Sequence, residues 1–331
     1  MAKETKKEQF KTMIGGQALI EGIMMRGPEK DAIVVRTKDG IEVETNPRKV
    51  RRKGSFATWP LIRGAVAFFD AQVTGVKALM RSADLSPEET QEEPSKFDKW
   101  LEKKLGNKKF QDFLVGSAVA LGLGMSILLF FLLPDIIVGL FDRWLPAGNL
   151  VHNLIQGAVR ILIFLVYMLL VSRMKEMKRV FSYHGAEHKT IHCYEAGLPL
   201  TVENVRKQTR KHPRCGTSFL FVVLILSILV FSLASSVLVA LIPALKTLEG
   251  TFLYKLIMIG CKLLMLPLVV AVAYEINRWV GRHDNLLTRI LTAPGLWFQN
   301  FTTFEPDDEM IEVGIASLEA VLPEQEGSDR W

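Results

Sequence analysis

The chain has 331 residues, with 41 Lys+Arg against 35 Asp+Glu, a formal net charge of +6 and 49% hydrophobic residues. Because the apolar residues come in long blocks, this composition excludes a wholly disordered chain and an ordinary soluble enzyme. Three cysteines (Cys193, Cys215 and Cys261) are too few for a disulfide framework and favour a reducing compartment. The charged first dozen residues lack the apolar stretch of a cleavable signal peptide. The sequence therefore predicts an integral membrane protein with soluble parts.

The N-terminal region, residues 1–83, is expected to be soluble. Alternating Val/Ile runs about Asp39-Gly40 predict a β-hairpin, and the segment from Pro60 predicts an amphipathic helix. That helix could lie on the membrane or pack against the spans. Five cations in residues 48–53 could bind anionic lipid, whereas no nucleic-acid module accompanies them. Residues 84–112 are expected to be a flexible acidic linker followed by a helix that leads into the first span.

Four membrane spans are predicted, at residues 113–133, 151–172, 217–245 and 252–274, since each is close to or above the ~20 residues needed to cross a bilayer. They give two pairs of transmembrane helices, at 113–172 and 217–274. Arg160 and Lys262 interrupt the second and fourth spans at similar depth. Ionisable groups there are costly, so we expect these two cations to have a partner or line a cavity, with snorkelling to the outer surface as the alternative.

The loop charges predict the orientation of these spans. Residues 1–112 carry 22 Lys+Arg and residues 173–214 carry ten, whereas residues 134–150 and 244–251 carry one each. Because basic loops stay in the cytosol, both termini and the 173–216 loop are predicted to be cytosolic. The bilayer is then the first expected partner.

The cytosolic loop at 173–216 holds the residues that point to chemistry. His184, His188 and His192 are four residues apart, so on a helix they share one face. Glu187 completes an inverted HExxH pattern, in which two imidazoles bind zinc and the carboxylate acts as general base on a metal-bound water. His212 and Cys215 have the close spacing of a zinc knuckle and could complete the ligand set. Mixed imidazole and thiolate ligands favour zinc, with iron behind. The alternative is that the histidines pair with acidic groups and the cysteines are merely buried.

The C-terminal region, residues 275–331, is expected to be cytosolic. Pro306 and Asp307 predict a helix start with Asp308 in its first turn. An apolar stripe then follows at Ile311, Ile315, Leu318 and Leu322 and is expected to face the core. The last eight residues are expected to be disordered. The fold class is therefore mainly α, with about four transmembrane helices, a small β-hairpin element and amphipathic cytosolic helices.

Four sequence blocks resemble the signatures of the YqhQ-like bacterial membrane proteins. These are GGQALIEGIMMRG (15–27), HGAEHKTIHCYE (184–195), HPRCGTSF (212–219) and PGLWFQNFTTFEPDDEMIEVGI (294–315). The resemblance covers nearly the whole chain and implies a bacterial cytoplasmic membrane location. That family is described as predicted metal-dependent enzymes, which implies a site at His184, Glu187, His188, His192, His212 and Cys215. Glu21, Asp307 and Asp308 fall in the same blocks and are expected as possible second-shell residues.

Two functions are compatible with these features. The leading one is metal-assisted hydrolysis at the inner membrane surface, with Glu187 as the base. The alternative is a non-catalytic assembly or biogenesis factor whose zinc is structural and whose basic N-terminal region docks a membrane-protein partner or the translocation machinery. Transport through the Arg160/Lys262 region is less favoured, because four spans without repeats are atypical of a transporter. The sequence does not settle whether the chain is an enzyme.

Overall fold

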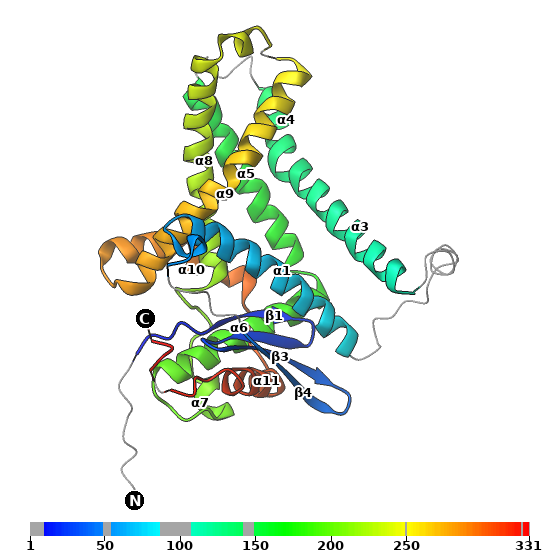
Figure 1. The fold of residues 1–331 in the computed structure, drawn as a ribbon, viewed down its shortest axis with the longest axis vertical. Coiled ribbons are helices and arrows are strands. Elements are labelled where there is room, and N and C mark those ends of the chain that lie inside the picture. The colour runs from blue at the N-terminus through cyan, green and yellow to red at the C-terminus, as the bar shows by residue number, and fades with distance from the viewer. Residues whose placement is uncertain are drawn as a thin grey trace, which may run out of the picture. The chain divides into compact units, whose positions relative to one another are not determined.

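The computed structural model describes residues 10–48, 54–86, 107–141, 149–248, 250–325 and 327–330. Four of its helices are long and apolar enough to cross a membrane: Phe113–Gly139, Leu154–Val171, Gly216–Leu241 and Phe252–Arg282. The expected mainly helical fold with four candidate spans is confirmed (Figure 1). The chain divides into two compact units, one of Met1–Ser86, Met168–Val230 and Cys261–Trp331, the other of Pro87–Tyr167 and Phe231–Gly260. Residues 49–53 of the cationic segment and 87–106 of the linker lie outside the described residues.

The first unit contains a four-stranded antiparallel sheet in which each strand pairs with the next. The strands are β1 (Gly15–Leu19), β2 (Gly22–Arg26), β3 (Lys30–Thr37) and β4 (Gly40–Pro47). The hairpin expected about Asp39-Gly40 is confirmed, since Thr37 pairs with Gly40 where β3 turns into β4. Gly40 has a φ of 132°, a conformation that favours glycine. The sequence did not predict β1 and β2, which precede this hairpin.

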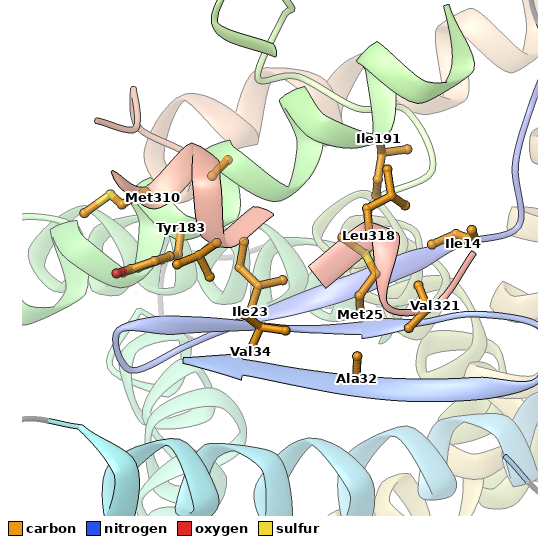
Figure 2. Close-up of a cluster of buried hydrophobic side chains, with 12 residues drawn as sticks. Ile14, Ile23, Met25, Ala32, Val34, Tyr183, Ile191, Met310, Leu318 and Val321 are labelled. Atoms are coloured by element: carbon orange, nitrogen blue, oxygen red, sulfur yellow. The ribbon is translucent and has the colours of Figure 1, made fainter. Parts of the chain in front are cut away.

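Both faces of the sheet are covered, and this explains the lack of alternation in β2. One face packs on α6 (Lys175–Glu195) and α11 (Asp308–Glu319) through a core that includes Ile23, Met25, Tyr183 and Leu318 (Figure 2). The opposite face packs on α1 (Ile62–Leu85), where Leu19, Met24 and Ala78 meet. Side chains of successive strand residues point to opposite faces. A strand with both faces buried is therefore apolar throughout.

Helix α11 begins where the sequence predicted. The Asp307 carboxylate accepts a hydrogen bond from the Met310 N–H at 2.8 Å and caps α11. Ile311 and Leu318 are fully buried, and Ile315 and Leu322 are partly buried against the same clusters, so the predicted core stripe is confirmed. Between the spans and α11 lies α10 (Leu286–Thr302). The remaining short elements of this unit are η1 (Phe56–Thr58) and α7 (Val202–Arg206).

The expected disorder at the end of the chain is wrong for residues 327–330. Thr12 and Arg330 form an isolated antiparallel bridge, and the Thr12 hydroxyl donates to a carboxylate oxygen of Asp329 at 2.5 Å. Asp329 is 1% exposed, because the N-terminal segment packs over it. A long-range contact of this kind leaves no local sequence signal.

The second unit contains a helical hairpin of the membrane part. Helix α3 (Asn107–Ile127) continues through a π-helical turn, η3 (Leu128–Leu132), into α4 (Leu133–Gly139), past the expected end of the span at Leu133. Helix α5 (Asn149–Val171) follows. Helices α8 (Gly216–Leu241) and α9 (Phe252–Arg282) contribute to both units, and η4 (Pro243–Leu248) connects them.

Arg160 has an internal partner in this unit. Its Nε donates to the Phe130 carbonyl oxygen at 2.7 Å, and its guanidinium lies 5.2 Å from the centre of the Phe131 ring. In an α-helix the N–H of residue 134 would bind that carbonyl, but residue 134 is proline and has no N–H. The residue after Pro134, Asp135, also has polar partners in this unit. Its carboxylate binds Gln156 at 2.9 Å and Lys255 at 3.1 Å. Lys262, the other expected intramembrane cation, is half-buried on α9.

Candidate metal centre

Helix α6 brings the three spaced histidines onto one face. The ring centres of His184 and His188 are 4.4 Å apart. The chain reverses after α6 at Gly197, whose φ is 66°, passes through α7, and returns alongside the histidine face. This return places the His212 ring 4.7 Å from His192 and Cys215 Sγ 3.2 Å from His184 Nε2. Residues that are 20 positions (His192 and His212) and 31 positions (His184 and Cys215) apart in the chain thus form one polar row along α6.

Three donor atoms converge at one end of this row. Ligand atoms of His184, His188 and Cys215 lie within 4.8 Å of one another. His184 Nδ1 lies 2.8 Å from the Thr302 carbonyl oxygen, and His188 Nδ1 lies 2.6 Å from the Arg210 carbonyl oxygen. Because a carbonyl can only accept, both Nδ1 atoms carry the proton and both Nε2 atoms remain available as ligands. Backbone carbonyls that orient imidazoles in this way are typical of metal sites.

Glu187 lies in the same site and is 4% exposed. Its Oε1 accepts a hydrogen bond from the Gly16 N–H on β1 at 2.8 Å. Within the described part of the chain, Glu187 Oε2 and His188 Nε2 are buried and have no hydrogen-bond partner. Burial raises the pKa of Glu187, although His184 and His188 oppose the shift. Unsatisfied buried polar atoms are rare and call for an ion or a water that satisfies them.

The electrostatics of the site favour an ionised thiol at Cys215. Burial opposes ionisation, yet the adjacent His184 and His188 hold the pKa of Cys215 well below its usual value. Burial also opposes protonation of His184, but Cys215 and Glu187 outweigh it and raise the pKa of His184 to about 9. Both shifts favour a thiolate at Cys215 and an imidazolium at His184 when no metal is bound. A thiolate is the form of cysteine that binds metals.

A second group of candidate ligands, His192, Glu195 and His212, lies at the other end of the row. A cation already occupies it, because the Arg214 guanidinium binds Glu195 and lies 3.3 Å from His212 Nε2. The Thr12 N–H also donates to Glu195 at 2.8 Å, and His192 Nε2 donates to the Lys211 carbonyl. Burial lowers the pKa of His212 to about 4. This group is therefore neutralised by Arg214, which disfavours a second metal ion.

The three acidic residues that were expected to support the candidate ligands have other partners. The Glu21 carboxylate binds Arg179 and accepts from the Tyr183 hydroxyl at 3.2 Å. Asp307 caps α11, and Asp308 pairs with Arg206. Cys193 is buried in a separate apolar cluster, where burial raises its pKa to about 11.

Other residues that support the site were not predicted. Besides Gly16 and Thr302, Gln299 on α10 accepts from the His212 N–H and donates to its carbonyl, both at 2.8 Å. A side chain at Gly16 would collide with the Met24 carbonyl and lie 3.2 Å from the Glu187 carboxyl carbon, so glycine permits the close approach of β1 to α6. The sequence could have indicated Gly16, Gln299 and Thr302 only through the family blocks, because Gly16 lies in the block 15–27 and the other two lie in the block 294–315.

The fold and this site define a multi-span membrane protein with a His/Cys/Glu cluster in the first of its two units. The chain belongs to the family described as "Protein of unknown function (DUF1385)", whose model matches residues 59–324. It is 32% identical over 328 residues to "Uncharacterized protein YqhQ" of Bacillus subtilis (strain 168), which covers 96% of this chain and 94% of that relative. No solved structure matches the chain. The resemblance seen in the four sequence blocks is thereby confirmed at the level of the family.

Proposed function

We propose that this protein is a zinc-dependent hydrolase of the bacterial cytoplasmic membrane, with His184, His188 and Cys215 as ligands and the site on the cytosolic side. The observation that carries the proposal is the buried His188 Nε2, which has no hydrogen-bond partner among the described residues and lies within 4.8 Å of ligand atoms of His184 and Cys215. A second buried atom without a partner there, Glu187 Oε2, belongs to the same side of α6. Three protein ligands are typical of catalytic zinc, whereas structural zinc takes four. Two imidazoles and a thiolate favour zinc over iron.

In this proposal each residue has a separate role. A zinc ion held by His184, His188 and Cys215 would supply Lewis acidity toward a water and toward the bond to be cleaved. Glu187 Oε2 would accept the proton of the attacking water, and burial, which raises the pKa of Glu187, makes its carboxylate a stronger base than an exposed one. The Gly16 N–H holds the other carboxylate oxygen, and so fixes the orientation of the base. The Thr302 and Arg210 carbonyls position the two imidazoles. A lipid, a peptide or a membrane-protein segment would each suit this chemistry.

A structural role for the zinc is the second candidate. The observation that favours it is the origin of the ligands, because His184 and His188 lie on α6 and Cys215 lies in the turn before α8. A metal ion bound by these three residues would cross-link the segment 207–215 to α6. The chain would then be an assembly factor that docks a membrane protein or the translocation machinery, and Glu187 would serve only in packing.

Metal analysis of the purified full-length protein tests the site. We expect about one zinc per chain, with X-ray absorption showing two nitrogen ligands, one sulfur and one further light atom. Replacing both His184 and His188 with Ala should abolish binding, because a single thiolate remains. His192→Ala is the matched control on the same helix face and should keep the zinc. Full zinc in the double variant, or loss in the control, would show that the ligands are assigned wrongly.

Glu187→Gln separates the two functions. Glutamine keeps the size of the side chain and can still accept from Gly16, so the zinc should stay at full stoichiometry. A catalytic base would be lost, and the variant should fail to complement a deletion strain in which the wild-type gene restores a measurable phenotype. Normal complementation with normal zinc content would refute catalysis and favour the structural role.

A further inference from the structure

Helix α1 exposes an apolar face that the other described elements of the first unit do not cover. Its small residues, including Gly75, Ala78 and Ser82, are buried. Ser82 accepts from a backbone N–H that follows β1, and Ala78 packs in the cluster with Leu19 and Met24. On the far side of the helix, large apolar side chains are exposed; they are Phe69, Val73, Val76, Leu79 and Met80. Figure 2 shows α1, in cyan, along the face of the sheet opposite the drawn core, so its exposed apolar side chains point away from the sheet.

Helix α10 has the same division. Its buried side carries Gln299 and Thr302, which hold His212 and His184 of the candidate centre. Its other side exposes Leu286, Leu287, Ile290, Leu291 and Trp297, and Trp297 is 50% exposed. Exposed apolar sectors of this size on two helices are unusual for a water-facing surface.

Both helices begin at the end of a candidate membrane span. Helix α10 starts at Leu286, directly after α9 ends at Arg282. The start of α1 is fixed to that same end of α9, because the Leu61 N–H and the Arg63 side chain both bind Glu275. Figure 1 shows both helices close to the lower end of α9. The exposed apolar faces thus start where α9 would leave the hydrocarbon core.

We propose that α1 and α10 lie in the bilayer interface, with their exposed apolar faces immersed among the lipid headgroups and upper acyl chains. An amphipathic helix in the plane of the membrane buries its apolar face about 5–10 Å into this boundary. The bilayer is the occupant because both faces continue from the span itself. Lys77 is exposed on α1, where its ammonium group would meet headgroup phosphates, whereas Arg81 pairs with Glu44 of β4. The contact extends the proposed function, because α10 would then meet the membrane with its apolar side while its opposite side holds His212 and His184. The contact itself does not depend on a metal.

Site-directed spin labelling of the full-length protein in lipid nanodiscs tests this contact. In a Cys261→Ser background, whose two other cysteines are buried, nitroxides are placed at Val73→Cys on α1 and Ile290→Cys on α10. The matched controls are Val43→Cys and Ile41→Cys, which are exposed on β4. We expect the first two labels to be relaxed mainly by oxygen, at a depth of about 5–10 Å, and the two controls mainly by a water-soluble nickel complex.

Two results would overturn the proposal. Nickel accessibility at 73 and 290 equal to that at 43 and 41 would mean that these faces lie in water. Protection from both reagents would mean that a protein, such as a second copy of this chain, covers them. Zinc content measured on the same samples keeps the proposed function separate, since an oxygen-accessible face without zinc would refute the metal centre and leave the membrane contact intact.

Discussion

The contact between Arg160 and the Phe130 carbonyl predicts a specific coupling between two positions in the membrane part. Arg160→Met removes the guanidinium that donates to Phe130 at 2.7 Å. Because Pro134 cannot donate, the carbonyl would then be buried without its partner, at a cost of about 1–3 kcal/mol. In a Pro134→Ala background residue 134 has an N–H that can bind the same carbonyl. Arg160→Met should therefore be less destabilising there by about 1–3 kcal/mol, which is about 5- to 150-fold in the unfolding equilibrium constant.

The assay is a double-mutant cycle on the purified protein, unfolded by SDS in mixed micelles. The cycle cancels the change in desolvation on removing the cation, since this change occurs in both backgrounds. Leu162→Met, at an exposed position on the same helix, is the control and should show no coupling to Pro134→Ala. Additivity of Arg160→Met and Pro134→Ala within about 0.5 kcal/mol would refute the argument that Arg160 replaces the missing N–H.

Three further predictions concern the candidate centre. Cys215→Ser should weaken zinc binding by more than about 100-fold in competition with a chelator, whereas Cys193→Ser should leave it unchanged; equal effects would contradict the assignment of the thiolate ligand. Gly185→Ala should destabilise the protein by about 1–3 kcal/mol in thermal unfolding, because its Cβ would collide with a backbone carbonyl, whereas Gly116→Ala has open space and serves as control. Since the pKa of His184 is raised to about 9 and that of Cys215 is held well below its usual value, zinc should displace one proton from this pair below pH 9. Apparent affinity should then rise about tenfold per pH unit up to that pH, and calorimetry of the Glu187→Gln variant in buffers of different ionisation enthalpy should find one proton released; a release of two would mean that the thiol is protonated.

Much of the fold follows from periodicity and composition. The four spans, the hairpin about Asp39-Gly40 and the start of α11 depend on local signals, namely apolar length, alternation and capping. The first two strands do not, because a strand buried on both faces loses the alternation that marks it. The packing of Asp329 under Thr12 depends on a contact across the whole chain, which no local pattern encodes.

The candidate centre was predictable only as a set of residues. Helical spacing brings His184, His188 and His192 onto one face, but it does not show which of them lie close enough to Cys215 to bind the same metal ion. Tertiary contacts make that division: Arg214 binds Glu195 at one end of the row, and the Arg210 carbonyl orients His188 at the other. The order of residues along the chain contains no trace of either contact.

The contacts within the first unit also constrain the side of the membrane on which each part of the chain lies. The Gly16 N–H binds Glu187, the Phe304 N–H binds the Phe181 carbonyl, and Arg36 pairs with Glu312. These contacts join the N-terminal region, the 173–215 loop and the C-terminal region in one unit, so all three must lie on the same side of a membrane. The chain must therefore cross the membrane an even number of times between any two of these three regions, and two spans lie between each region and the next.

This constraint does not depend on the loop charges. The loop charges predict that the shared side is the cytosol, because residues on that side carry 22 and ten cations whereas each opposite loop carries one. Arg160 in the second span would disfavour insertion by about 2.5–3.5 kcal/mol, but failure of that span alone would separate Gly16 from Glu187 by the bilayer. Burial of the Arg160 guanidinium against Phe130 therefore helps to maintain the arrangement on which the candidate centre depends.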